Sequence, residues 1–331
     1  MVPCMKIKLA QIITLLLTTL TICAVSGCST WDTLKSAHTT TDISGNAKTQ
    51  PIDTHVKVKV DVIKPKTIPL LTRGMTGNEA LWYNEALAIL GYLPVTWNDP
   101  QTSELQSTTA ATYTTPTNDT ENEEMIESQF ATQLVHHQLE PILSVQWSWK
   151  GNYPEVLQND WNPYKATAIT QGAIMSFEHQ HQLAVDGIAG PEVNQALYQA
   201  LLHHQQNSQP YTYIEVQKTK PETLQVWESG QPIFKSLANT GIAASPTPNG
   251  IWPVYLRLKE QTMRGTNPNG TPYDDPGVPF INYFYHSDAV HGFIRASYGF
   301  PQSLGCVELP MINAKTVYSI IHYGTPVQII S

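Results

Sequence analysis

Residues 291–310 read HGFIRASYGFPQSLGCVELP, and this stretch carries the chemistry of the chain. It opens on a His-Gly pair and ends shortly after Cys306, which directly follows Gly305. A histidine within hydrogen-bond reach of a thiol can remove its proton and later return that proton to a leaving amine. A glycine before the cysteine lets the backbone turn tightly, and the amide N–H groups of such a turn can hold an oxyanion. The stretch therefore predicts Cys306 as a nucleophile with His291 as its general base and acid.

The spacing within this stretch resembles that of the YkuD-type L,D-transpeptidases, whose signature is His-Gly, a gap, and then Ser/Thr-X-Gly-Cys. The chain supplies His291-Gly292 and, after the gap, Ser303-Leu304-Gly305-Cys306. Upstream, SPTPNGIWPVY at residues 245–255 looks like the Thr-Pro-x-Gly segment that precedes a strand in this family. The resemblance covers roughly residues 211–331. It implies an enzyme that cross-links peptidoglycan in cell-wall and cell-shape biogenesis, without a metal or an organic cofactor.

The resemblance also implies a role for each residue of the motif. Cys306 would attack the carbonyl between the third residue and the terminal D-Ala of a tetrapeptide stem, and D-Ala would leave. An amine from a neighbouring stem would then resolve the thioester. The imidazole of His291 would be oriented by the backbone carbonyl of Gly292, and Gly305 would belong to the loop that holds the oxyanion. Candidate substrate-binding residues near this motif are Ser303, Arg295 and His286.

Two positions depart from the family pattern. Leu304 stands where the family often has histidine, but that position varies. Glu308 stands two residues after the cysteine, where arginine or asparagine is usual, so the charge at this point is reversed. Arg295, in the intervening loop, is a candidate replacement for the missing cation. We expect the departure at Glu308 to affect recognition of the donor stem more than the nucleophile.

Two other functions remain open at this point. With water as the acceptor, the same nucleophile would make an L,D-carboxypeptidase or another cysteine hydrolase of the cell wall. A chain whose motif had lost activity would be a non-catalytic wall-binding lipoprotein. The intact pair of Cys306 and His291 favours an enzyme. Paired histidines at 179/181 and 203/204 have no carboxylate or cysteine that would complete a ligand set, so no metal site is predicted.

The N-terminus predicts an exported lipoprotein. Two lysines precede an apolar run that is shorter than a comfortable membrane span, and residues 1–27 end in Val-Ser-Gly before Cys28, which resembles a bacterial lipobox. Lipidation of Cys28 would anchor the chain to the membrane on the extracytoplasmic side, at the cell wall. Removal of residues 1–27 would leave Cys306 as the one free thiol. Residues 28–69, rich in Thr, Ser and Lys, read as a linker.

Composition limits the partners of the chain. The formal net charge is −8, and an acidic surface repels phosphate, so nucleic acid is not an expected partner. The expected partners are peptidoglycan stem peptides, with the membrane reached through the N-terminal lipid. The protein is expected to be a monomer.

Residues 70–208 predict a small helical domain. Apolar residues recur at helical spacing in 78–90, where Gly91 ends the pattern, and again after Pro191, which suits the first turn of a helix. Residues 74–92 and 177–197 resemble the two halves of a three-helix peptidoglycan-binding domain. A low-complexity insertion at about residues 100–160 separates the two halves.

From residue 211 the pattern changes to short strands rich in Val, Ile, Tyr and Phe. One helix, at 313–322, interrupts them near the end. The expected fold class is therefore α+β and multidomain: a helical peptidoglycan-binding bundle followed by a β-rich, sandwich- or barrel-like catalytic domain at 211–331. Strands are predicted in 211–217, 223–241, 250–259, 279–286 and 325–330, with a hairpin turn at Ser229-Gly230.

Overall fold

The structure is a computed structural model that describes residues 70–98 and 146–331. The predicted signal peptide, Cys28, the linker 28–69 and the Ser/Thr-rich part of the insertion lie outside these residues. The described residues belong to one compact unit. Across them, no helix combines the length and the apolar character that a membrane crossing needs.

The helical region is built on α1 (Asn78–Ile89), α5 (Ala168–Gln180) and α6 (Pro191–Leu202). Helix α1 ends where the sequence predicts, because Gly91 adopts a φ of 77°, which glycine tolerates without a steric penalty. Pro191 occupies the first turn of α6, also as predicted. Large side chains from the three helices fill a common core, among them Trp82, Tyr83, Phe177 and Leu197. Assignment of this region to a peptidoglycan-binding domain stays a prediction.

The structure describes the end of the predicted insertion, from residue 146 onward. Strand β1 (Val95–Asn98) pairs antiparallel with β2 (Gln146–Trp149), and the short helix α4 (Glu155–Gln158) follows. The low-complexity composition ends well before this segment, which is instead rich in aromatic residues. Trp147, Trp149 and Tyr153 pack on the core of the helical region, and that burial holds the segment in place.

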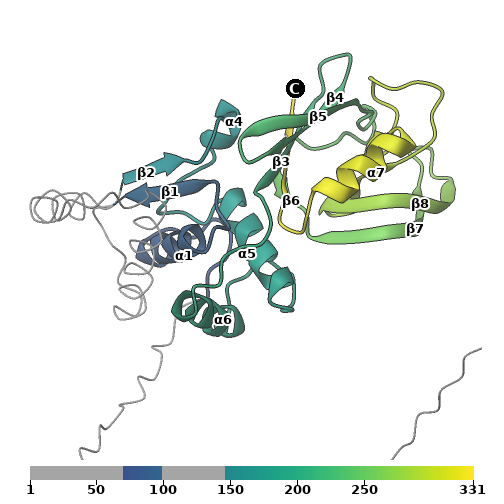
Figure 1. The fold of residues 1–331 in the computed structure, drawn as a ribbon. Coiled ribbons are helices and arrows are strands. Elements are labelled where there is room, and N and C mark those ends of the chain that lie inside the picture. Colours follow the sequence, from purple (N-terminus) through teal and green to yellow (C-terminus); the bar gives the residue numbers. More distant parts are fainter. Residues whose placement is uncertain (1–69, 99–145) are drawn as a thin grey trace, which may run out of the picture. The chain divides into compact units, whose positions relative to one another are not determined.

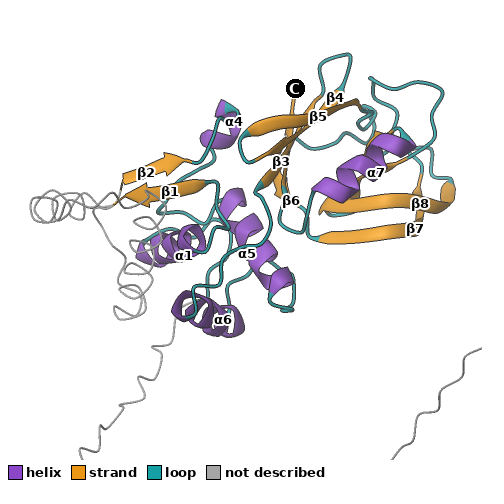
Figure 2. Cartoon of the chain, viewed as in Figure 1, coloured by secondary structure: helices purple, strands orange, loops and turns teal. Residues whose placement is uncertain are grey.

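The C-terminal region is β-rich, as predicted, and consists of two mixed sheets and a helix (Figures 1 and 2). The first sheet has the order β5-β4-β3-β11-β6 and the second has the order β10-β9-β8-β7. The strands of the first sheet are β3 (Thr212–Gln217), β4 (Thr223–Glu228), β5 (Gln231–Leu237), β6 (Gly250–Pro253) and β11 (Pro326–Ile330). Those of the second are β7 (Leu256–Thr266), β8 (Pro272–Tyr285), β9 (Asp288–Gly292) and β10 (Val307–Leu309).

Both sheets contribute to a shared apolar core. Val216 and Val327 come from the first sheet, and Val290 and Leu309 come from the second. Helix α7 (Met311–Ile320) lies across β8 and β9 and adds Val317 to this core. Figure 1 shows α7 over the sheet that contains β7 and β8. This core is what holds the second sheet, and with it the predicted catalytic residues, in a fixed position.

The helical region packs closely on the first sheet. Helix α5 contacts β6 and β11. At the closest point, a Cβ on Gly172 would collide with the carbonyl oxygen of Gly324, and a Cβ on Gly324 would collide with that of Gly172. Because both positions are glycine, the two backbones can approach this closely. The guanidinium of Arg73 spans the same junction and donates a hydrogen bond to the carbonyl of Ile251 at 3.0 Å.

Candidate active site

Parallel pairing of β9 with β10 brings the two halves of the motif together. In this ladder Val307 lies opposite Val290, and Glu308 lies opposite His291. Cys306 immediately precedes β10, so it sits beside the start of β9. His291 and Cys306 both line a pocket of about 690 Å³. The motif residues Ser303, Leu304 and Arg295 and the departing residue Glu308 line the same pocket.

His286, the third candidate for substrate binding, does not line this pocket. It lies in the turn between β8 and β9 with a left-handed φ of 45°, rather than on a strand. Its ring meets the edge of Tyr285 with centroids 4.4 Å apart. The turn therefore directs His286 away from the pocket of Cys306, while the next residues, Ser287 and Asp288, line it.

The imidazole of His291 is held in one orientation. Its Nδ1 lies 3.1 Å from the carbonyl oxygen of Gly292, the contact expected from the sequence motif. A proton on Nδ1 makes this a hydrogen bond and leaves Nε2 as the acceptor. The side chain is almost completely buried, and desolvation lowers the pKa of His291 below its usual value. The ring is therefore neutral at neutral pH and can act as a base.

The surroundings of Cys306 favour the protonated form of its thiol. Burial raises the pKa of Cys306 to about 12, and the carboxylates of Asp288 and Glu308 raise it further in the same direction, against a backbone N–H from Ala289 that lowers it. The thiol lies 3.8 Å from the carbonyl oxygen of Ser287 as a weak donor. Attack by this sulfur therefore requires that its proton be removed as the bond forms.

Gly305 is required by the packing of the loop before the cysteine. Its φ is 118°, and a Cβ at this position would collide with the carboxylate of Asp288. Two carbonyl oxygens of the loop accept hydrogen bonds from the segment at 245–247. Thr247 Oγ1 donates to the carbonyl of Gly305 at 2.7 Å, and Ser245 Oγ donates to that of Leu304 at 2.9 Å. Because N–H and C=O point in opposite directions in a trans peptide, the N–H of Cys306 points away from Thr247.

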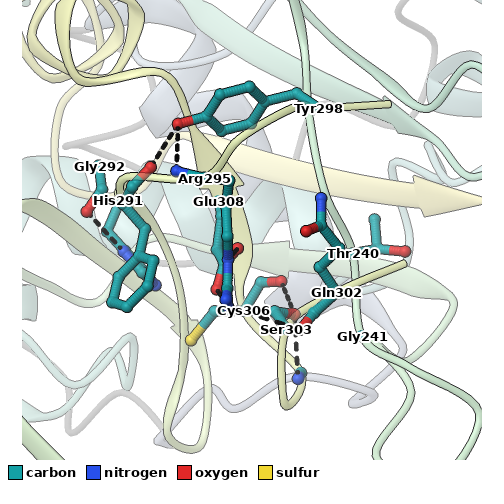
Figure 3. A network of polar contacts seen from close by, with 12 residues as sticks. Thr240, Gly241, His291, Gly292, Arg295, Tyr298, Gln302, Ser303, Cys306 and Glu308 are labelled. Carbon is teal, nitrogen blue, oxygen red and sulfur yellow. Dashed lines mark hydrogen bonds and ion pairs between the residues drawn. The ribbon is translucent and has the colours of Figure 1, made fainter. Parts of the chain in front are cut away.

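Ser303 braces the same loop. Its hydroxyl donates to the carbonyl of Cys306 at 2.5 Å and accepts from the N–H of Gly305 at 3.3 Å. The residue is 1% exposed. Figure 3 shows these bonds around the turn that carries the sulfur. The hydroxyl is thus used as both donor and acceptor within the loop, so Ser303 helps to fix the loop. Its role in substrate binding stays a prediction.

Glu308 and Arg295 form a two-pronged ion pair in the pocket. Nε of Arg295 lies 2.8 Å from Oε2 of Glu308, and its NH2 nitrogen lies 2.7 Å from Oε1 (Figure 3). Glu308 is 4% exposed, whereas Arg295 is more accessible and stacks over the ring of Phe293 at 4.6 Å. The pair raises the pKa of Arg295 through its hydrogen bonds to Glu308. The reversed charge at 308 is therefore matched by a cation from the crossover loop.

Several residues of the site were not singled out from the sequence. Asp288 contacts the backbone at Gly305, and burial raises the pKa of its carboxyl to about 6. Tyr298 holds the crossover loop by donating to the carbonyl of Phe293 at 2.5 Å. Ser245 and Thr247 belong to the Thr-Pro-x-Gly segment, so the resemblance marked their segment but not the bonds that they make. Nothing in the sequence pattern distinguished Asp288 or Tyr298.

Within residues 70–98 and 146–331, no three His, Cys, Asp or Glu side chains are grouped so as to hold a metal ion. The reactive groups that the pocket does offer are a thiol, a neutral imidazole, and backbone amides of a braced loop. This set of groups suits acyl transfer.

Comparison with solved structures finds L,D-transpeptidases. One from Mycobacterium smegmatis is 21% identical with a TM-score of 0.35, and the alignment covers 37% of this chain and 59% of that one. L,D-transpeptidase 3 from Mycobacterium tuberculosis is 20% identical with a TM-score of 0.33, and the coverage is 37% and 62%. The catalytic domain of the E. faecium L,D-transpeptidase is 26% identical with a TM-score of 0.32, and the coverage is 38% and 100%.

The chain therefore spans about three-fifths of the length of the Mycobacterium smegmatis structure that it matches. Comparison with curated proteins finds no match. Among protein families, residues 211–329, a little over a third of the chain, match the family described as YkuD, the L,D-transpeptidase catalytic domain.

Proposed function

We propose that this protein is a cell-wall L,D-transpeptidase that forms peptidoglycan cross-links through a cysteine thioester. One observation carries the proposal. Cys306 and a neutral, oriented His291 line the same pocket, and that pocket lies within the residues that match the catalytic family. The substrate is a tetrapeptide stem, and the bond that is broken joins its third residue to the terminal D-Ala.

The first half of the reaction forms the acyl-enzyme. Nε2 of His291 takes the thiol proton while Sγ of Cys306 attacks the carbonyl carbon. The backbone N–H of Cys306, turned away from Thr247, donates a hydrogen bond to the developing oxyanion. As the intermediate collapses, the imidazolium returns the proton to the departing amine of D-Ala. A thioester remains on Cys306, and His291 is again neutral.

The second half transfers the stem to an acceptor. A neighbouring stem's amine attacks the thioester, His291 accepts a proton from it, and the thiol leaves with a proton restored. The raised pKa of Cys306 favours a mechanism in which the proton and the sulfur move together, because a free thiolate is disfavoured in this pocket. Arg295, held by Glu308 at the pocket wall, is the cation that we assign to a carboxylate of the donor stem.

The location of the protein is part of the same proposal. A lipid on Cys28 would hold the catalytic region at the extracytoplasmic face of the membrane, where its substrate lies. Replacing Cys28 by Ala should release the protein from washed membranes into the soluble fraction. If the variant stays with the membrane as tightly as the parent does, the lipoprotein interpretation is wrong.

A carbapenem tests the nucleophile, because its strained carbonyl presents an electrophile like that of the donor. The full mass of the drug should add to Cys306, with the thiol proton going to the opened ring's nitrogen. Cys306→Ser should abolish this adduct. His291→Ala should slow acylation by roughly 10²–10⁴-fold, the usual range for a lost acid–base group. Mass spectrometry of the intact protein and of its peptides measures both effects.

Leu304→Ala is the control for this experiment, since the loop uses the backbone carbonyl of Leu304 and not its side chain. It should leave acylation within a few-fold of the parent. A Cys306 that stays unmodified in the folded parent protein would contradict the catalytic role.

The state of the thiol can be tested by its pH dependence. Alkylation by iodoacetamide needs the thiolate, so with a pKa of about 12 its rate at Cys306 should still rise about tenfold per pH unit between pH 8 and 10. Asp288→Asn removes a negative charge that appears as pH rises through about 6, and this should lower the pKa of the thiol. The variant should therefore alkylate several-fold faster at pH 8.

Asp274→Asn is the matched control, because Asp274 is exposed and pairs with Arg264. It should leave the alkylation rate of Cys306 unchanged, as followed by the mass of the peptide that contains it. A rate that levels off by pH 8 in the parent would instead mean that Cys306 and His291 rest as a thiolate–imidazolium pair.

A further inference from the structure

A second pocket lies at the junction of the helical region and the first sheet, apart from the pocket of Cys306. Its volume is about 490 Å³, within the range of pockets that take small-molecule ligands. Arg73, Gln171 and Asp186 line it from the helical side. The opposite wall is aromatic and is formed by Trp252, Tyr255, Phe284, Tyr285 and His286.

The aromatic wall is pre-arranged. The rings of Trp252 and Tyr285 lie 4.4 Å apart at 50°, so together they form a bent apolar surface. The guanidinium of Arg73 lies 5.1 Å from the centre of the Trp252 ring. It also donates to the carbonyl of Ile251, the residue before Trp252. These contacts join the two walls, so the pocket exists before any ligand arrives.

The polar rim is mixed in charge. Arg73 supplies a cation and Asp186 an anion, and Gln171 and His286 add planar polar groups. An anionic ligand would meet Asp186, and a cationic ligand would meet Arg73. A neutral ligand with an apolar face and hydroxyl or amide groups at its edge suits all of these side chains at once. Sugar rings have this form, with C–H groups that stack on aromatic faces and hydroxyls that bond to planar polar side chains.

The turn between β8 and β9 connects this pocket to the reacting groups. His286 lines the aromatic pocket, whereas Ser287 and Asp288 line the pocket of Cys306. The hydroxyl of Tyr255 donates to the carbonyl of His286 and fixes the turn from the aromatic side. The carbonyl of Ser287 faces the thiol on the other side. A ligand in the aromatic pocket is therefore one turn of chain away from the nucleophile.

We propose that this aromatic pocket binds the glycan chain of the cell wall, as a neutral N-acetylated amino-sugar unit. The inference rests on the proposed function, because it is the stem peptide carried by that glycan which would pass over the β8–β9 turn to Cys306. The pocket would thus select stems that are still attached to sugar, and it would set the direction in which a stem enters the reaction pocket.

The test measures sugar binding without chemistry. Full-length protein with Cys306→Ser is titrated with the tetrasaccharide of N-acetylglucosamine, which is neutral and carries no peptide, by isothermal titration calorimetry. We expect saturable binding at one site. Trp252→Leu and Tyr285→Leu should each weaken the affinity by about tenfold or more, as the loss of a central aromatic contact does. Gln171→Ala, on the rim, should weaken it without changing the core and guards against a folding defect.

Tyr164→Ala is the matched control, since Tyr164 is an exposed aromatic residue of the helical region that does not line the pocket. It should bind as the parent does. Absence of saturable binding, or binding that these three pocket variants leave unchanged, would overturn the assignment. Competition at this site by a sugar-free tetrapeptide would also overturn it, in favour of a peptide site. The carbapenem experiment reports separately on Cys306, so failure of the proposed function and failure of the sugar site give different results.

Discussion

Parallel pairing of β9 with β10 is the constraint on which the site depends. Two parallel neighbours cannot be joined by a tight turn and need a crossover of about a dozen residues or more. Residues 293–306 form that crossover, which gives a physical reason for the gap between His-Gly and Gly-Cys in the motif. The register then sets His291 and Glu308 side by side and places Cys306 just before the first paired residue of β10.

The pocket favours the uncharged forms of the two groups that we propose to react, the imidazole of His291 and the thiol of Cys306. Burial lowers the pKa of His291 and raises that of Cys306, so both favour their neutral forms near neutral pH. A neutral thiol reacts slowly with oxidants, which matters for a lone thiol in the oxidising compartment that we propose for this protein. Reactivity would then appear only when a carbonyl is presented to the sulfur. The ion pair of Arg295 and Glu308 holds the crossover loop against β10 and places one fixed cation at the pocket wall.

Local signals predicted much of the fold. Gly91 after α1, Pro191 at the start of α6 and Ser229-Gly230 between β4 and β5 act through backbone preferences that do not depend on distant partners. Strands β9 and β10 were missed because they are short and exist only through their pairing with each other and with β8. Strand β2 and helix α4 were missed because this segment was grouped with the Ser/Thr-rich sequence before it. Its aromatic residues, which pack on the core of the helical region, were therefore not taken as a sign of structure.

The candidate site, like the fold, was predicted from the sequence only in part. The motif pointed to Cys306, His291 and Gly292 because their order in the chain carries the signal. It did not show that the hydroxyl of Ser303 forms hydrogen bonds within the loop. Nor did it show that His286 lines the second pocket or that Asp288 packs against Gly305. Each of these depends on contacts between segments that are far apart in the sequence or on a turn with positive φ.

The central claim is that the pocket of Cys306 transfers a stem peptide to an amine. The direct measurement is to incubate the purified protein with disaccharide-tetrapeptides and to identify the products by mass. The account predicts cross-linked dimers together with released D-Ala, and neither product with Cys306→Ser. Tripeptides without dimers would mean that water is the acceptor and the enzyme is a hydrolase. Unchanged substrate would contradict catalysis and would leave a protein that only binds the wall.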